Sequence, residues 1–247
     1  MSVGVRTARR NVGGAGRSYG EADEGPRQHL DGVASADRDG HVAQKKSLHA
    51  SEADSPEIQR ERECFVRRRV IRSAARLLFI DETGINLSMT RAYARAPVGE
   101  RACDAVPKNW GDNVTVTAAL TLDGIVAPMM LHGAMNGRAF EAYVEQCLGP
   151  ELRPGDVVVL DKLGAHKVVR VRELVEARGA SLVFLPSYSP DFNPIEHAWS
   201  KLKALLRKAG ARTLRKLSRA LRAALLAITP GDSHGWFSHC GFRVPCS

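Results

Sequence analysis

The sequence predicts an α/β protein, with a mixed sheet that carries helices on its faces. Two apolar runs at 77–80 and 157–160 have the length and composition of strands buried on both faces. Asp123-Gly124 separates two further β-rich runs, which favours a hairpin. Strands that come first and then alternate with helices combine antiparallel and parallel pairing in one sheet.

Each element follows from the local pattern. A polar helix is expected from about Ser55 to Arg69, because Pro56 suits a first turn. A last helix is expected from Pro194, with Asn193 as its cap and apolar residues at helical spacing. The expected core elements are strands 76–82, 114–120 and 125–131, helix 136–148, strand 157–161, helix 167–178, strand 182–185 and the helix from Pro194.

The chain is expected to have four parts. Residues 1–44 include eight glycines in the first forty and no hydrophobic periodicity, so we expect a disordered or non-homologous segment, or sequence upstream of the true coding frame. A linker with a short helix at 45–75 leads into a core domain at 76–230, which includes basic C-terminal helices. Residues 231–247 are expected to form a tail.

Three acidic residues stand in separate, recognisable settings. Asp81 and Asp161 each end an apolar run, and Glu196 lies in the first turn of the last helix. Open α/β sheets place their sites at the edge where such strands end. Taken singly, a strand-end aspartate often caps a turn, and an acid near a helix start is favourable electrostatically. Together they predict a site for two divalent cations such as Mg²⁺, used in phosphodiester chemistry.

A basic segment follows the third acid. The formal net charge of +9 suits a polyanionic partner, and residues 201–222 contain nine Lys or Arg and no acid. The alternative to DNA binding is an ordinary solvated helix face, with the helix broken near Gly210 and leucines forming the buried stripe. The residues predicted to bind DNA phosphates are Lys201, Lys203, Arg207, Lys208, Arg212, Arg215, Lys216 and Arg219.

Other classes are disfavoured by composition. Five cysteines without a CxxC pair argue against a disulfide framework, so a reduced, cytoplasmic protein is expected. No apolar run approaches the roughly 20 residues needed to span a bilayer, so no membrane partner is expected. No Gly-rich phosphate loop is present in the sequence, which leaves an NTP-driven mechanism without support.

Three blocks of the chain, 79–84, 159–167 and 185–196, carry a family resemblance, and 95–101 and 135–140 extend it. The chain resembles DDE transposases of the mariner superfamily, specifically the bacterial insertion-sequence branch. Thirty-four residues separate Asp161 from Glu196, the spacing for which that branch is named. The similarity runs from about Lys45 to Phe242.

The resemblance implies a ribonuclease H-like fold and a function. Asp81, Asp161 and Glu196 would hold two Mg²⁺ ions, with Mn²⁺ as an alternative, for cleavage at element ends and strand transfer. The implied partners are double-stranded DNA, as element ends and target, and a second copy of the chain in a homodimer. The implied location is the bacterial cytoplasm, in association with the nucleoid.

Two departures from the family pattern keep alternatives open. Lys162 stands where the family usually has Asn, and a cation there can pair with Asp161 or repel a metal. No helix-turn-helix pattern precedes residue 70, so a separate reading frame could supply an N-terminal DNA-binding part. The alternatives are an impaired remnant that only binds DNA or a transposase subunit, and a nuclease of the same fold. His166, and with it Asn193, could modulate the site, or His166 simply caps or packs at its helix.

Overall fold

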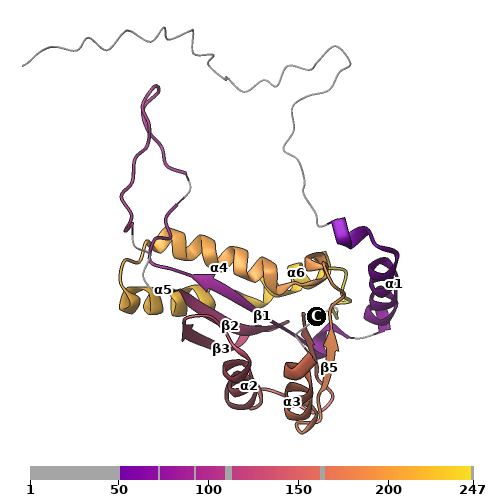
Figure 1. Ribbon diagram of the computed structural model, residues 1–247. Coiled ribbons are helices and arrows are strands. Elements are labelled where there is room, and N and C mark those ends of the chain that lie inside the picture. Colours follow the sequence, from indigo (N-terminus) through magenta and orange to yellow (C-terminus); the bar gives the residue numbers. More distant parts are fainter. Residues whose placement is uncertain (1–50, 72, 92, 109–112, 162–164, 246–247) are drawn as a thin grey trace, which may run out of the picture. The chain divides into compact units, whose positions relative to one another are not determined.

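A mixed sheet organises the part of the chain that the structure, a computed structural model, describes: residues 51–245 without 72, 92, 109–112 and 162–164 (Figure 1). The chain divides into two units, Met1–Leu48 and His49–Ser247, and every described residue lies in the second. The expectation for residues 1–44 therefore falls outside the described residues. Within them, five strands have the order β3-β2-β1-β4-β5. They are β1 (Leu77–Ile85), β2 (Val114–Thr121), β3 (Gly124–His132), β4 (Val157–Leu160) and β5 (Ser181–Phe184).

The pairing combines two directions, as the sequence predicted. β1, β2 and β3 pair antiparallel, and the β2–β3 turn contains Asp123, with Gly124 directly after it as the first residue of β3. Gly124 has a φ of 120°, which L side chains rarely adopt, so a glycine suits this turn. On the other side of β1, β4 and β5 pair parallel, with Leu77↔Val157 the first registered pair.

β1 is longer than the sequence indicated, and this corrects the placement of Asp81. The expected strand ended at residue 82, but antiparallel pairing with β2 continues to Ile85↔Val114. Asp81 consequently lies inside β1 rather than at its end. Parallel pairing with β4 stops at Phe79↔Val159, so Asp81 stands beyond the paired part on that side only.

The helices fall close to their expected positions. The helix expected from 136 to 148 is divided into α2 (Gly137–Tyr143) and a π-helical turn, η3 (Val144–Leu148). The main helices are α1 (Pro56–Ile71), α2 (Gly137–Tyr143), α3 (Ala165–Glu176), α4 (Ile195–Ala209), α5 (Leu214–Leu226) and α6 (Pro230–His239). Three short 3-10 turns, η1 (Ser51–Asp54), η2 (Ala74–Arg76) and η4 (Pro190–Phe192), complete the described elements.

The sheet has a hydrophobic core on each face. Leu77 and Phe79 of β1 point into a core shared with α4, α5 and α6, whereas Leu78 and Ile80 point into a core shared with α2 and α3. Figure 1 shows α4 on one side of the sheet and α2 and α3 on the other. Burial on both faces explains the continuous apolar runs that predicted β1 and β4.

The basic segment is two helices, as expected. Gly210 ends α4 in the left-handed conformation, with a φ of 56°, and its N–H donates to Leu206 O. Thr213 caps α5, because its side chain accepts a hydrogen bond from Lys216 N. Leu217 and Leu221 of α5 are buried, whereas Leu214, the first residue of the helix, is 39% exposed.

The segment expected as a C-terminal tail belongs to the core, which corrects that expectation. α6 begins with a capping box between Thr229 and Asp232. Phe237 is fully buried and packs edge-on against Phe79 of β1. The polar composition of α6 hid this contact from sequence patterns, since its apolar residues are few.

Two further expectations concern cysteines and membranes. Cys64, Cys103, Cys147 and Cys240, the cysteines that the structure describes, are all free thiols. No helix within the described residues is both long and apolar enough to cross a bilayer.

Candidate active site

Asp81, Asp161 and Glu196 come from three elements that meet at one edge of the sheet. Asp81 and Asp161 each stand two residues past the last β1–β4 pair, Phe79↔Val159, with Asp81 inside β1 and Asp161 directly after β4. Glu196 lies in the first turn of α4, and α4 packs against β1. The register of two strands and the start of one helix therefore bring the three predicted carboxylates together.

The electrostatics of the site show that these carboxylates interact. Burial raises the pKa of Asp81 to about 7, and the charges of Glu196 and Asp161 contribute to this rise. Hydrogen bonds from Glu82 N–H and from Trp199 act in the opposite direction, because they stabilise the charged form. Partial burial also raises the pKa of Asp161, although its side chain keeps an exposed surface. A positive charge placed at this site would therefore stabilise the ionised carboxylates.

Trp199 fixes Asp81, and this role was missed in the sequence. Its Nε1–H donates to Asp81 Oδ2 at 3.1 Å, and its ring is 2% exposed. The sequence indicated only a buried position at helical spacing. A signal was available, because a buried indole N–H usually finds an acceptor and Trp199 lies one turn after Glu196.

A cleft of about 320 Å³ opens beside two of the acids. Its lining includes Tyr188, which has a φ of +54° and is therefore held in the left-handed region that costs a non-glycine residue free energy. The lining residues are Asp161, Pro186, Ser187, Tyr188, Ser189, Pro190, Asn193 and Glu196.

Asn193 does not cap α4, which corrects the sequence prediction. Pro194 occupies the N-cap position, and no side chain caps the helix there. Asn193 instead ends η4 in an extended conformation, is 2% exposed, and its Oδ1 has no hydrogen-bond partner among the residues that the structure describes. Its backbone carbonyl accepts the hydrogen bond from Glu196 N. Asn193 thus contributes a buried amide to the wall of the cleft.

The donor set suits a hard divalent cation. Such ions prefer carboxylate oxygens, and the raised pKa values show that added positive charge would be favourable here. No three His, Cys, Asp or Glu side chains among the described residues are already arranged as a metal site. Asp161 and Glu196 are exposed, so their carboxylates can turn toward a cation in the cleft without unpacking the core.

The structure describes three sequence neighbours of the acids to different extents. Glu82 is exposed and alternates with Asp81 along β1, as expected for a residue on the other face. Lys162 lies outside the described residues. His166 lies in the first turn of α3, and the described part of the structure excludes its side chain.

The predicted DNA-binding residues divide into two groups. Lys201 forms an ion pair with Asp232 of α6, which holds the pKa of that carboxyl at about 2, together with hydrogen bonds from Thr229. Arg212 donates to the carbonyl oxygens of Leu87 and Met89. These two cations therefore make intramolecular contacts. The others, exposed or half-buried on α4 and α5, are Lys203, Arg207, Lys208, Arg215, Lys216 and Arg219.

A larger cavity, of about 660 Å³, lies between the segment after β1 and the end of α4. Arg91, Arg95, Arg207 and Lys208 line it, together with Asp104. None of the three clustered acids lines this cavity, so the carboxylates, rather than cavity size, locate the candidate active site. Its basic lining instead extends the positive surface of α4.

The known proteins that this chain resembles in sequence include two transposases. The Tc1 transposase of Caenorhabditis elegans is 30% identical over 143 residues, which are 53% of this chain and 52% of the relative. The Tcb1 transposase of Caenorhabditis briggsae is 28% identical over 169 residues, or 64% of this chain and 61% of the relative. The chain thus spans between half and two thirds of the length of these curated relatives.

Solved structures share the fold. A Mos1 strand transfer complex has a TM-score of 0.62 at 16% identity, covering 81% of this chain and 63% of that one. A mariner Mos1 paired end complex with Mg has a TM-score of 0.62 at 17% identity, covering 81% and 65%. The isolated catalytic domain of Mos1 mariner transposase aligns over its whole length, and over 82% of this chain, with a TM-score of 0.50 and 12% identity. The expected ribonuclease H-like arrangement is therefore confirmed.

The family is established by the sequence itself. The domain family described as DDE superfamily endonuclease matches residues 76–218, which is more than half of the chain and includes all three acids. The chain therefore belongs to the DDE superfamily endonucleases, and it is similar to the transposases named above.

Proposed function

We propose that this chain is the catalytic part of a transposase that cleaves DNA strands at the ends of an insertion sequence and transfers them to a target. The observation that carries this proposal is the meeting of Asp81, Asp161 and Glu196 at one sheet edge, where burial and the two neighbouring acids raise the pKa of Asp81. Family membership supports the reaction class, because the matched region contains the same three residues.

Mg²⁺ is the proposed cofactor, as two ions held by Asp81, Asp161 and Glu196, with Mn²⁺ as an alternative. Two Mos1 structures are described as complexes with Mn and with Mg, which supports a divalent cation here. Bound there, such ions would neutralise charge on a phosphate undergoing displacement and acidify a hydroxyl nucleophile. The protein's contribution is to hold three oxygen donors on separate rigid elements.

The other residues of the site have supporting tasks. Trp199 orients the Asp81 carboxylate by donating its indole N–H to Oδ2. Burial under α4 keeps water away from that carboxylate and thereby strengthens its interaction with any cation. Asn193 offers an amide on the cleft wall to a substrate group.

The proposed partners are double-stranded DNA, as element end and target, and a second copy of the chain. Neighbouring structures include a Mos1 paired-end complex with a left transposon end, which supports DNA as substrate. We further propose membership of the bacterial insertion-sequence branch and a nucleoid location, supported by the thirty-four residues between Asp161 and Glu196. A separate reading frame as the source of an N-terminal DNA-binding part also stays a proposal.

A plasmid-nicking and strand-transfer assay in Mg²⁺ tests the proposed function, with Glu196→Gln as the control. Nicked plasmid and joined products from the wild type, both absent with Glu196→Gln, would support a transposase. Nicking without joining under conditions that assemble both ends would instead favour a nuclease of the same fold. Wild type that binds DNA but neither nicks nor joins would favour the impaired remnant.

Neutralising the basic surface should weaken DNA binding on every sequence alike. Replacing Lys203, Arg207, Arg215 and Arg219 by Gln removes charges that lie exposed or half-buried on α4 and α5, so the dependence of log affinity on log salt should flatten by up to about 0.9 for each phosphate that is no longer neutralised. Fluorescence anisotropy across a salt series measures this slope.

The matched control for the basic surface is Arg170→Gln with Arg172→Gln on α3, because these arginines pair with Glu173 and Glu176. The control should leave the salt dependence as it is in the wild type. An unchanged slope in the α4 and α5 variant as well would identify a solvated face.

Lys162→Asn should raise Mg²⁺ affinity and the cleavage rate. A lysine next to Asp161 carries a positive charge that at about 4–6 Å repels a cation and competes for the carboxylate. Asparagine lacks that charge and can donate a hydrogen bond to a carboxylate. Titrating Mg²⁺ against cleavage rate for both versions measures the change, and identical midpoints and rates would show that Lys162 points away from the site.

A further inference from the structure

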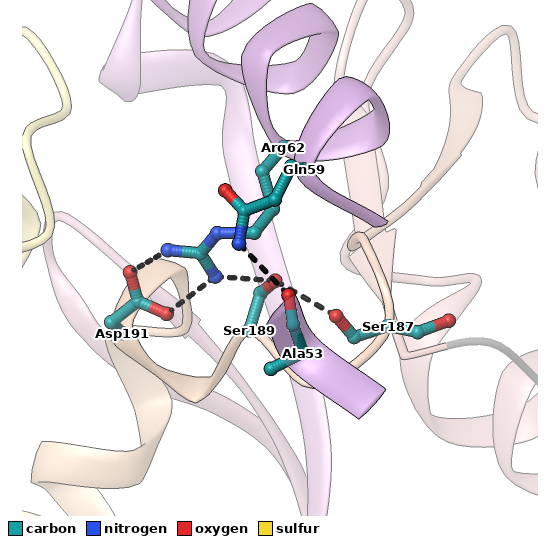
Figure 2. Close-up of polar contacts among 6 residues, drawn as sticks. All are labelled: Ala53, Gln59, Arg62, Ser187, Ser189 and Asp191. Atoms are coloured by element: carbon teal, nitrogen blue, oxygen red, sulfur yellow. Dashed lines mark hydrogen bonds and ion pairs between the residues drawn. The ribbon is translucent and has the colours of Figure 1, made fainter. Parts of the chain in front are cut away.

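Arg62 of α1 forms hydrogen bonds with the segment that leads into Glu196. Its Nη2 donates to Asp191 Oδ2 at 2.7 Å and its Nη1 to Asp191 Oδ1 at 3.0 Å, which makes a two-pronged contact. Nη1 also donates to Ser189 Oγ at 2.7 Å. Figure 2 shows the guanidinium between the two side chains, with Ser187 next along the segment. Three charge-assisted bonds from one rigid fork fix both position and orientation.

Aromatic contacts around Arg62 distinguish its ion pair with Asp191 from an ordinary surface ion pair. The guanidinium lies over the Phe192 ring, 4.4 Å from its centroid. Phe65, one turn later on α1, stacks on the same ring at 5.5 Å. The Arg62 side chain is 23% exposed, whereas that of Arg67 on the same helix is 80% exposed. Arg62 is therefore held between a ring and two acceptors.

Further hydrogen bonds connect Ser189, which contacts Arg62, to Glu196. Ser189 Oγ donates to Ser187 O, and Phe192 N donates to Ser189 O. Asn193 N then donates to Pro190 O, and Glu196 N donates to Asn193 O. The segment 187–193 is thus one hydrogen-bonded unit whose far end sets the first turn of α4.

The same unit contains the strained residue of the cleft. Tyr188, at a φ of +54°, lies between Ser187 and Ser189. A non-glycine residue persists in that conformation only when its surroundings fix it, and such strain gathers at functional sites. Arg62 supplies part of that surrounding structure, because its Nη1 donates to the hydroxyl of Ser189, the next residue.

We propose that Arg62 is a positioning residue: through Ser189 and Asp191 it holds the 187–193 unit so that Glu196 faces Asp81 and Asp161. This inference rests on the proposed function, because Glu196 needs placing only if it is a ligand. It adds a residue 127 positions from Ser189 in sequence to the machinery of the site. The geometry of Glu196 then depends on the docking of α1.

Hydrogen exchange tests the positioning without any need for activity. In Arg62→Ala, exchange of the backbone amides at 187–198 should become at least about tenfold faster, while amides in β1 and β4 keep their rates. Two variants on the same helix are controls. Arg67→Ala removes an exposed charge that pairs with Glu63, and Gln59→Ala removes a hydrogen bond to Ala53 O that does not reach the unit. Unchanged exchange at 187–198 in Arg62→Ala overturns the inference.

Mg²⁺ binding and cleavage test the consequence at the site. Arg62→Ala should shift the Mg²⁺ midpoint upward in calorimetry and lower the cleavage rate at saturating DNA by about 10–100-fold, as loss of a supporting contact does. Affinity for DNA should stay within about twofold. Arg62→Lys, which supplies one charge but no fork, should recover part of the rate, and the exchanged pair Arg62→Asp with Asp191→Arg should recover more than either single change.

The outcomes separate this inference from the proposed function. If wild type binds Mg²⁺ but does not cleave, the function fails while the exchange and calorimetry still judge Arg62. If Arg62→Ala melts earlier yet the folded protein keeps the wild-type Mg²⁺ midpoint and rate, Arg62 only docks a helix and the inference is wrong.

Discussion

Replacing Glu196 by Gln, or Asp81 or Asp161 by Asn, is expected to lower metal-dependent DNA cleavage roughly 10³-fold or more while the fold persists. Each change removes one anionic oxygen donor at nearly constant volume, and loss of a preorganised group that stabilises developing charge has effects of this size. Because the charges of Glu196 and Asp161 raise the pKa of Asp81, each loss also relieves repulsion in the folded protein.

Glu82→Gln is the matched control for this series. It removes a carboxylate one residue from Asp81, but on the exposed, opposite face of β1. Cleavage of a supercoiled plasmid, followed under single-turnover conditions, measures the rates, and circular dichroism verifies the fold. If all three acid variants nick DNA as fast as Glu82→Gln does, the assignment of Asp81, Asp161 and Glu196 as the catalytic triad is wrong.

The metal-free protein should lose stability as the pH rises, because of Asp81. The folded pKa of Asp81 is about 7, above its ordinary value of 3.8, so the folded state holds a proton that the unfolded chain has released. The associated stability is fully present below about pH 4 and is lost as the pH rises through about 7. Its size is on the order of 2–4 kcal/mol, since one pKa unit corresponds to about 1.4 kcal/mol.

Asp81→Asn isolates this contribution, since the amide oxygen can still accept from Trp199 and carries no charge. In chelator, the variant and wild type should have similar free energies of unfolding at pH 4, and the variant should gain progressively up to pH 8. At pH 8 its Tm should be higher by roughly 5–10 °C. Urea unfolding at several pH values measures the difference, and a gap independent of pH would contradict the role of Asp81.

Added Mg²⁺ should reverse this ranking in the same samples. A cation that binds only the folded wild type raises its stability by mass action, whereas Asp81→Asn has lost a ligand and should respond less. The inactive variant would thus be the more stable protein without metal. A Tm of wild type that does not respond to Mg²⁺ would argue against cation binding at these acids.

Local patterns predicted most of the fold. Runs of Val and Leu bounded by polar residues located β4, and Asp123-Gly124 located the hairpin, because these signals depend on neighbouring residues alone. The end of β1 was misplaced, since Ile85 stays in the strand only through pairing with Val114, far along the chain. α6 was taken for a tail because a single buried ring, Phe237, carries much of its packing.

The acids of the candidate site were predictable and their supports were not. Asp81, Asp161 and Glu196 stand in recognisable motifs, whereas Trp199 looked like one more buried residue. Arg62 stands in a helix crowded with charges, and its partners Ser189 and Asp191 are 127 and 129 positions away. No local pattern distinguishes it from Arg67, which faces solvent.

The position of β1 in the sheet also decides when the site can exist during synthesis. β1, β2 and β3 follow one another along the chain and can pair as soon as they emerge from the ribosome. Asp81 meets Asp161 only after β4 has added on the other side, and Glu196 arrives later still, with α4. A nascent chain therefore carries the first acid of the cluster long before the cluster itself can form.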